Sequence, residues 1–185
     1  MKHVRLLTLA AVFSLAVGVS AAQGPGAASA GQAQVAADRA TAQLRNADGQ
    51  VVGDAVLSET AHGVLIHVTL TNLPEGTHAF HIHQTGRCEP PFTTAGGHFN
   101  PGNRQHGFDN AMGMHAGDFP NIQVPPGGRL TFDVLAPEVT LKPGPNSLFD
   151  ADGSALVIHQ GADDYKSDPA GNAGARIACG VITKG

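Results

Sequence analysis

The stretch Val64-Leu65-Ile66-His67-Val68-Thr69-Leu70 places an aliphatic side chain at every second position. Successive residues of a β-strand point to opposite faces of a sheet, so this alternation predicts a strand with one buried face. Leu130-Thr131-Phe132-Asp133-Val134 repeats the pattern farther along the chain. Helical periodicity is not sustained anywhere in the sequence. The two stretches therefore predict an antiparallel β protein.

Turn-forming residues divide the rest of the chain into short segments of this kind. Asp48-Gly49 predicts a hairpin turn, and residues 72–76 predict another. Aliphatic side chains are expected to fill the core together with Phe80 and Phe132. The fold class that we predict is all-β, an eight-stranded Greek-key sandwich or flattened barrel. Besides the two stretches above, strands are expected at 41–46, 51–59, 78–83, 154–159 and 176–182.

The first 40 residues are expected to lie outside this domain. Residues 1–22 have the features of an export signal: Lys2 and Arg5, an apolar stretch, and small residues for cleavage. A membrane anchor is the weaker alternative, because the stretch is shorter than the roughly 20 residues that a spanning helix needs. Residues 23–40 are rich in Ala, Gly, Gln and Ser, which predicts a flexible linker before a single domain at 41–185. We expect an exported protein of the periplasm, cell envelope or extracellular space, without stable membrane insertion.

Acidic residues outnumber basic ones, 15 against 11, for a formal net charge of −4. Loss of the predicted signal would remove Lys2 and Arg5 and no acid, leaving 9 basic and 15 acidic residues and a net charge of −6. Such a surface excludes nucleic acid as the expected partner.

The two cysteines, Cys88 and Cys179, lie far apart in a chain predicted to be exported. Thiols oxidise outside the cytoplasm, so one disulfide is the default expectation and a free reactive thiol is the weaker alternative. Closure of so long a loop stabilises a fold by about 4 to 5 kcal/mol in chain-entropy models, and engineered cases often deliver less.

Two segments, 84–123 and 160–175, are too long for simple connections between strands, and long loops usually carry function. Seven of the ten histidines lie between residues 78 and 159, in or beside these loops. His81 and His83 are separated by one residue, so in a strand both project from the same face. Such a pair beside a histidine-bearing loop favours a metal site, since imidazole suits copper, zinc, iron and nickel.

The first long loop adds His98, His106, His115 and Asp118. The wide spacing is unlike that of a zinc finger, but three imidazoles and a carboxylate can surround a tetrahedral zinc ion. A solvated polar loop is the alternative. His159, at the end of an apolar run, is a further candidate ligand, although alone it could be a hydrogen-bonded core histidine.

Four strings, in this order, resemble the copper/zinc superoxide dismutase family in its bacterial secreted form, over residues 41–185. They are His78-Ala79-Phe80-His81-Ile82-His83, Gly97-His98-Phe99-Asn100-Pro101, His115-Ala116-Gly117-Asp118 and Gly171-Asn172-Ala173-Gly174-Ala175-Arg176-Ile177-Ala178-Cys179-Gly180-Val181.

The resemblance implies two metal sites that share one ligand, His98. It places Asp163 behind them, hydrogen-bonded to one ligand of each set, and treats His78 as structural. His62 and His67 match no motif and are expected to face solvent. The implied copper ligands are His81, His83, His98 and His159, and the implied zinc ligands are His98, His106, His115 and Asp118.

The implied activity converts superoxide to oxygen and hydrogen peroxide by alternate reduction and oxidation of copper, with zinc organising the loop. His98 would carry a proton, and Arg176 would attract and orient the anion. The family also implies a disulfide between Cys88 and Cys179 that holds the first loop near Arg176. The second loop carries Lys166 among several aspartates, which leaves electrostatic steering by that loop open, and a homodimer is possible.

Three alternatives belong to other classes. The first is a copper- and zinc-binding sandwich without turnover, the second a zinc hydrolase, and the third a purely adhesive sandwich. A hydrolase would need a spare carboxylate beside an open zinc position, and Asp118 would complete the zinc shell instead. An adhesive domain has no need of the ordered histidines.

Overall fold

The structure is a computed structural model that describes residues 38–185. The predicted signal at 1–22 and residues 23–37 of the predicted linker lie outside the described residues. Arg39 and Ala40, at the end of the range assigned to the linker, already belong to the first strand. Within the described part of the chain, no helix has the length and apolar character needed to cross a membrane.

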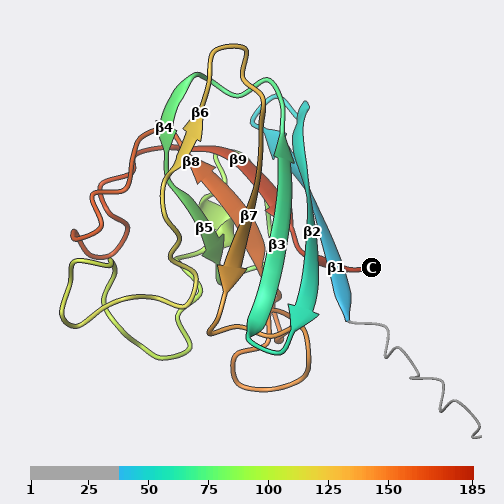
Figure 1. Ribbon diagram of the computed structural model, residues 1–185, viewed down its shortest axis with the longest axis vertical. Helices are drawn as coiled ribbons and strands as arrows, with labels where there is room; N and C mark the ends of the chain where they lie inside the picture. The colour runs from blue at the N-terminus through green and yellow to red at the C-terminus, as the bar shows by residue number, and fades with distance from the viewer. Residues whose placement is uncertain (1–37) are drawn as a thin grey trace, which may run out of the picture. The chain divides into compact units, whose positions relative to one another are not determined.

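The described residues form strands joined by loops, with one short 3-10 helix (Figure 1). Most elements lie where the alternation predicted them; β6 and β10 were not expected. The elements are β1 (Arg39–Asn46), β2 (Val51–Thr60), β3 (Gly63–Leu70), β4 (Gly76–His78), β5 (Phe80–His83), η1 (Thr93–Ala95), β6 (Ile122–Val124), β7 (Leu130–Ala136), β8 (Ala155–His159), β9 (Arg176–Val181) and β10 (Thr183–Lys184).

The main sheet has eight strands in the order β5-β8-β9-β1-β2-β3-β7, with β10 also paired to β1. Every strand pairing in it is antiparallel, and several neighbours are distant in sequence. In Figure 1 the sheet curls so that β7 and β3 lie across the domain from β5 and β8. The small sheet of β4 and β6 continues this path, because β4 leads through Ala79 into β5. The predicted all-β class is therefore confirmed.

The predicted strand 78–83 is divided at Ala79 because its pairing partner changes there. β4 pairs with β6, whereas β5 pairs with β8. At the junction the Ala79 amide donates to the carbonyl of Gly161, and its own carbonyl accepts from the amide of His159. The second long loop is thereby attached to the strand that carries the His81 and His83 pair.

The core lies inside the curl of the main sheet, against its inner face. Val64, Ile66 and Val68 of β3 are fully buried while the residues between them are exposed, as the alternation predicted. Phe80 is also fully buried, and its ring lies 5.5 Å from the ring of Phe132. Phe132 packs against this core as expected but remains partly buried, because β7 is the last strand of the sheet.

Candidate metal centre

The strand β5 positions the first two candidate ligands. All four of its residues are buried, and it pairs with β8 along one edge only. The first long loop lies along the other edge, where the Ile82 amide donates to Gly117 (3.0 Å) and the Ile82 carbonyl accepts from Phe99 (2.8 Å). These bonds place His98 opposite His83 and Asp118 opposite His81. The loop residues of the candidate site are therefore held by backbone pairing to a core strand.

This close approach explains one glycine of the His115-Ala116-Gly117-Asp118 string. A Cβ atom on Gly117 would lie inside contact distance of the Ile82 carbonyl oxygen and 3.1 Å from the Phe99 amide nitrogen. Only glycine lets the two backbones come this close. The residue therefore serves the positions of its neighbours His115 and Asp118.

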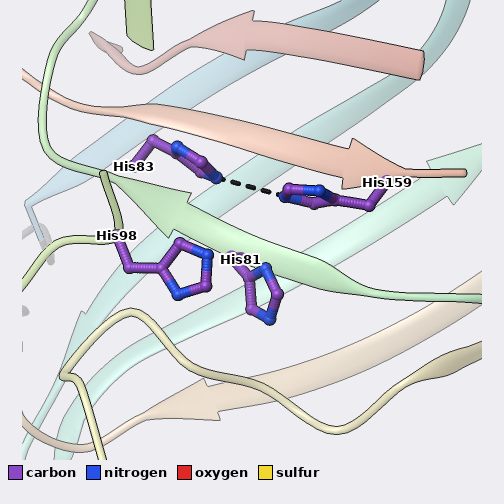
Figure 2. A group of neighbouring side chains, drawn as sticks. All are labelled: His81, His83, His98 and His159. Carbon is purple, nitrogen blue, oxygen red and sulfur yellow. Dashed lines mark hydrogen bonds between the residues drawn. The ribbon is translucent and has the colours of Figure 1, made fainter. Parts of the chain in front are cut away.

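The first group of candidate ligands consists of four histidines, His81, His83, His98 and His159. Two of these imidazoles face each other with their unprotonated nitrogens. The Nε2 atoms of His83 and His159 are 3.3 Å apart, and the dashed line in Figure 2 joins them. On the other side of each ring, Nδ1 donates a proton to a backbone carbonyl, that of Gly96 for His83 (3.0 Å) and that of Gly174 for His159 (3.3 Å). In the neutral rings both Nε2 atoms then carry a lone pair, which suits a cation between them.

His81, from β5, and His98, from the first long loop, complete this group (Figure 2). His81 donates from Nε2 to Asp163 Oδ2 (2.8 Å), so its Nδ1 carries the lone pair. Within residues 38–185, neither His81 Nδ1 nor His98 Nε2 has a hydrogen-bond partner, although both are buried. Each of the four residues offers one nitrogen, and these atoms lie within 4.8 Å of one another. Four imidazole nitrogens in a compact group suit copper.

The second group is built around Asp118. Its Oδ1 atom lies 2.8 Å from His98 Nδ1, 3.0 Å from His106 Nδ1 and 3.4 Å from His115 Nδ1. A tetrahedral zinc ion with bonds of about 2.0 to 2.1 Å needs ligand atoms about 3.3 Å apart, which these distances approach. Oδ2 of Asp118 accepts the amides of Gly107 (3.1 Å) and His115 (2.9 Å), so the carboxylate orientation is fixed. His98 belongs to both groups, one nitrogen to each.

Asp163 joins the two groups through hydrogen bonds. Its Oδ1 accepts from His106 Nε2 (2.9 Å) and its Oδ2 from His81 Nε2 (2.8 Å). The Asn121 side chain holds the Asp163 backbone at both its amide (2.8 Å) and its carbonyl (2.9 Å). Such carboxylates set which ring nitrogen is free to bind a metal.

Burial controls the protonation of most of these rings in the metal-free chain. It lowers the pKa of His83 well below 6.5, that of His98 to about 4 and that of His159 to about 3. Burial opposes the charge of His106 as well, but hydrogen bonds to Asp118 and Asp163 outweigh it and raise the His106 pKa to about 9. Neutral rings with free lone pairs are the form that binds metal.

In the two carboxylates, hydrogen bonding rather than burial determines the direction of the pKa shift. Burial would raise the pKa of Asp118 and that of Asp163, but hydrogen bonds from the neighbouring imidazoles outweigh it. Both pKa values are held well below the usual range. Both groups therefore stay ionised and offer oxygen as a ligand or acceptor.

Arg176 lies at the start of β9, beside the first group. Its guanidinium donates to the carbonyls of Phe92 (2.6 Å) and Gly96 (2.7 Å), and its charge contributes to the lowered pKa values of His83 and His159. The loop that supplies these carbonyls is tied to β9 a second time by a disulfide. The expected bond between the two cysteines is present and joins Cys88 to Cys179.

All the side chains predicted as metal ligands are buried and lie in these two groups, and their binding of metal stays a prediction. His78 bonds backbone carbonyls, while His62 and His67 are exposed. Sequence reasoning missed Asn121 and the carbonyl of Gly174. Neither belongs to the histidine pattern, and no signal in a single sequence marks them.

Comparison with known proteins identifies the family of the chain and its fold. The model of the family described as copper/zinc superoxide dismutase matches residues 51–182. A Cu-Zn superoxide dismutase of Aquifex aeolicus is 56% identical over 147 residues, which cover 78% of this chain and 86% of the relative. A double mutant of a SOD-like protein from Bacillus subtilis superposes with a TM-score of 0.74 at 46% identity, covering 76% of this chain and 95% of that one. The Cu/Zn superoxide dismutase from Brucella abortus gives 0.63 at 30% identity, covering 78% and 99%.

Fold and site together define an all-β metalloprotein with two adjoining histidine-rich groups. The chain belongs to the copper/zinc superoxide dismutase family. It is an oxidoreductase of the superoxide dismutase type, and its cofactors are copper and zinc. The resemblance read from the four strings is confirmed.

Proposed function

We propose that the two groups divide the metals of the family between them. The observation that carries this proposal is a set of buried side-chain nitrogens that have no hydrogen-bond partner within residues 38–185: Nδ1 of His81, Nε2 of His98 and Nδ1 of His115. Each belongs to one of the two groups, and a buried polar atom without a partner is costly unless something binds it. Copper is held by His81, His83, His98 and His159, and zinc by His98, His106, His115 and Asp118.

Copper bound in the first group supplies reversible one-electron chemistry, which oxidises one superoxide to oxygen and reduces a second to hydrogen peroxide. The residues around it provide charge, orientation and a proton. Arg176 keeps its guanidinium at the site through two carbonyls, where it attracts and orients a small anion. His98 Nε2 is buried in the same group, and it could hold a proton for the forming peroxide when its bond to copper is released.

The zinc group has an organising part in this proposal. Asp118 and the rings of His106 and His115 come from a loop that lacks regular secondary structure. Zinc would hold these three side chains together and fix the orientation of His98, whose Nδ1 faces Asp118. A metal-binding sandwich without turnover would have no need of a guanidinium held at the site, so the position of Arg176 supports the enzyme.

Three measurements on the same purified protein test the assignment of the metals and the activity. Purified protein is analysed for copper and zinc, its superoxide decay rate is measured, and anomalous scattering at the two absorption edges locates each metal. We expect one copper at the four-histidine group, one zinc at the Asp118 group, and rapid decay. Copper at the first group without any acceleration of decay would contradict the proposal.

We also propose that the chain is exported, with a signal at 1–22 and a linker that ends before β1, so that the enzyme domain begins at Arg39 rather than at residue 41. The charged and apolar order of the first residues and the Cys88–Cys179 disulfide support this. The mass of the mature protein and its recovery from periplasm, envelope or medium test the proposal. Light scattering tests whether it forms a homodimer, and partition between membrane and soluble fractions tests the expected lack of stable insertion.

A further inference from the structure

Tyr165 is the only tyrosine of the chain, and it lies in the second long loop, two residues after Asp163. Its φ is 60°, a left-handed conformation that costs most residues about 1 to 2 kcal/mol. Glycine adopts this conformation without that cost. The fold therefore keeps an aromatic residue where the backbone alone would favour a smaller one, and the side chain must have a task that outweighs the strain.

This residue joins the second long loop to the first. The Tyr165 hydroxyl accepts the Asn121 amide (2.7 Å), and the ring lies 5.2 Å from the ring of Phe108. The Tyr165 carbonyl accepts the Asp109 amide (2.9 Å). The two loops approach so closely here that a Cβ atom on Gly107 would lie inside contact distance of the same carbonyl oxygen. Tyr165 thus contacts the first loop just after His106 and again near its end.

The contacts of Tyr165 converge on the carboxylate of Asp163. The Tyr165 amide donates to Asp163 Oδ1 (2.7 Å), the same oxygen that accepts from His106 Nε2. The Asn121 side chain holds the Asp163 backbone at both its amide and its carbonyl. Since the Tyr165 hydroxyl binds the Asn121 amide, it fixes the residue that in turn holds Asp163.

We propose that Tyr165 is a positioning residue for the metal centre. Its amide bonds the Asp163 carboxylate directly, and its hydroxyl acts on Asp163 by way of Asn121. The rings of His81 and His106 take their orientation from that carboxylate. Glycine at this position would relieve the backbone strain but would leave the Asn121 amide without the hydroxyl. The inference rests on the proposed metal sites and adds a residue that acts on their ligands through Asp163.

The test compares metal binding by the wild type, Tyr165→Phe, Asn121→Ala, the double variant and, as the control, Ser167→Ala. Tyr165→Phe removes one hydroxyl and keeps the ring and the backbone. Ser167→Ala also removes one hydroxyl from the second loop, but that hydroxyl accepts from the Asn172 side chain of the same loop (3.0 Å). The two variants therefore differ in whether the lost bond joins the second loop to the first.

Zinc affinity, measured by competition with a chelator, should fall roughly three- to tenfold in Tyr165→Phe, less than the loss of a direct partner of a ligand would cause. In the Asn121→Ala background the same change should have little further effect, because the hydroxyl acts through Asn121. Cobalt bound in place of zinc should show an altered visible spectrum in Tyr165→Phe, since the ring of His106 is less well oriented. Ser167→Ala should match the wild type in both measurements.

An unchanged zinc affinity and cobalt spectrum in Tyr165→Phe would overturn the inference. So would equal changes in Ser167→Ala, because loss of any hydroxyl from the loop would then explain them. Additive losses in the double variant would also overturn it, since the hydroxyl would then not act through Asn121. In each of these cases the wild type still binds zinc, whereas a wild type that binds no zinc would contradict the proposed metal sites instead.

Discussion

Gly171 packs directly against Asp163, the carboxylate that joins the two candidate metal groups. A single methyl group added at Gly171 should break the hydrogen bond between His106 and Asp163. A Cβ atom at this position would lie 2.7 Å from His106 Nε2 and inside contact distance of Asp163 Oδ1. These two atoms are the ones that form the hydrogen bond between His106 and Asp163. Gly171→Ala must therefore displace that bond.

Gly174→Ala is the matched control. Both glycines have positive φ, 62° at Gly171 and 77° at Gly174, so alanine brings a backbone strain of about 1 to 2 kcal/mol at either position. A Cβ atom at Gly174, however, would have no atom of the described structure within 4 Å. The control thus carries the strain without the clash.

Loss of an outer hydrogen bond of this kind lowers metal affinity about 10- to 100-fold. We expect this loss in zinc affinity for Gly171→Ala and almost none for Gly174→Ala, measured by competition with a chelator of known affinity. Denaturant unfolding of the metal-free proteins should give similar backbone costs for both. Equal zinc affinities for the two variants would refute the reasoning, because the contact with Asp163 would then have no part in holding zinc.

Four further outcomes are expected. His159→Ala should abolish superoxide decay while zinc content stays near one per chain, and an active variant would contradict its assignment to copper. Arg176→Ala should slow the reaction with copper content unchanged, which a rate equal to wild type would disprove. Asp118→Ala should chiefly lose zinc and order in its loop, to be checked by zinc analysis and hydrogen exchange. In the metal-free protein, stability should fall as the pH drops below about 6.5, because burial lowers the pKa of His98 to about 4 and this ring takes up a proton more readily when unfolded. Stability should also fall as the pH rises from about 6.5 to 9. The pKa of His106 is raised to about 9 in the folded chain, so over this range the unfolded chain loses a proton that the folded chain still holds. Unfolding curves from pH 4 to 10 that show no maximum near neutrality would contradict this.

The sequence predicted the parts of the fold that depend on local pattern. The alternation in β3 forecast its buried and exposed faces correctly, because one face of that strand lies on the core. The short strands β6 and β10 were missed, since three and two residues are too few for a pattern. The division between β4 and β5 was missed for another reason. It depends on a partner, Gly161, that lies far away in the chain.

The candidate site was predictable where chemistry restricts the residue type. Imidazoles and a carboxylate at ordered positions are visible in one sequence, and the resemblance to a family assigned them to two metals. The supporting bonds were not visible. Any residue can offer the backbone carbonyl that Gly174 gives to His159, and Asn121 meets Asp163 only in the folded chain.

The hydrogen bonds of Asp163 make the two candidate metal groups depend on each other. His98 reaches both groups through its own ring, and Asp163 adds a second connection from His81 to His106. A change in the loop around His106 can therefore reach His81 without passing through a metal. The backbone bonds from Ile82 to Gly117 and to Phe99 oppose such movement, because they hold the loop to a core strand. For this reason loss of zinc should loosen the loop near His106 first, while the four imidazoles of the copper group stay close to their positions.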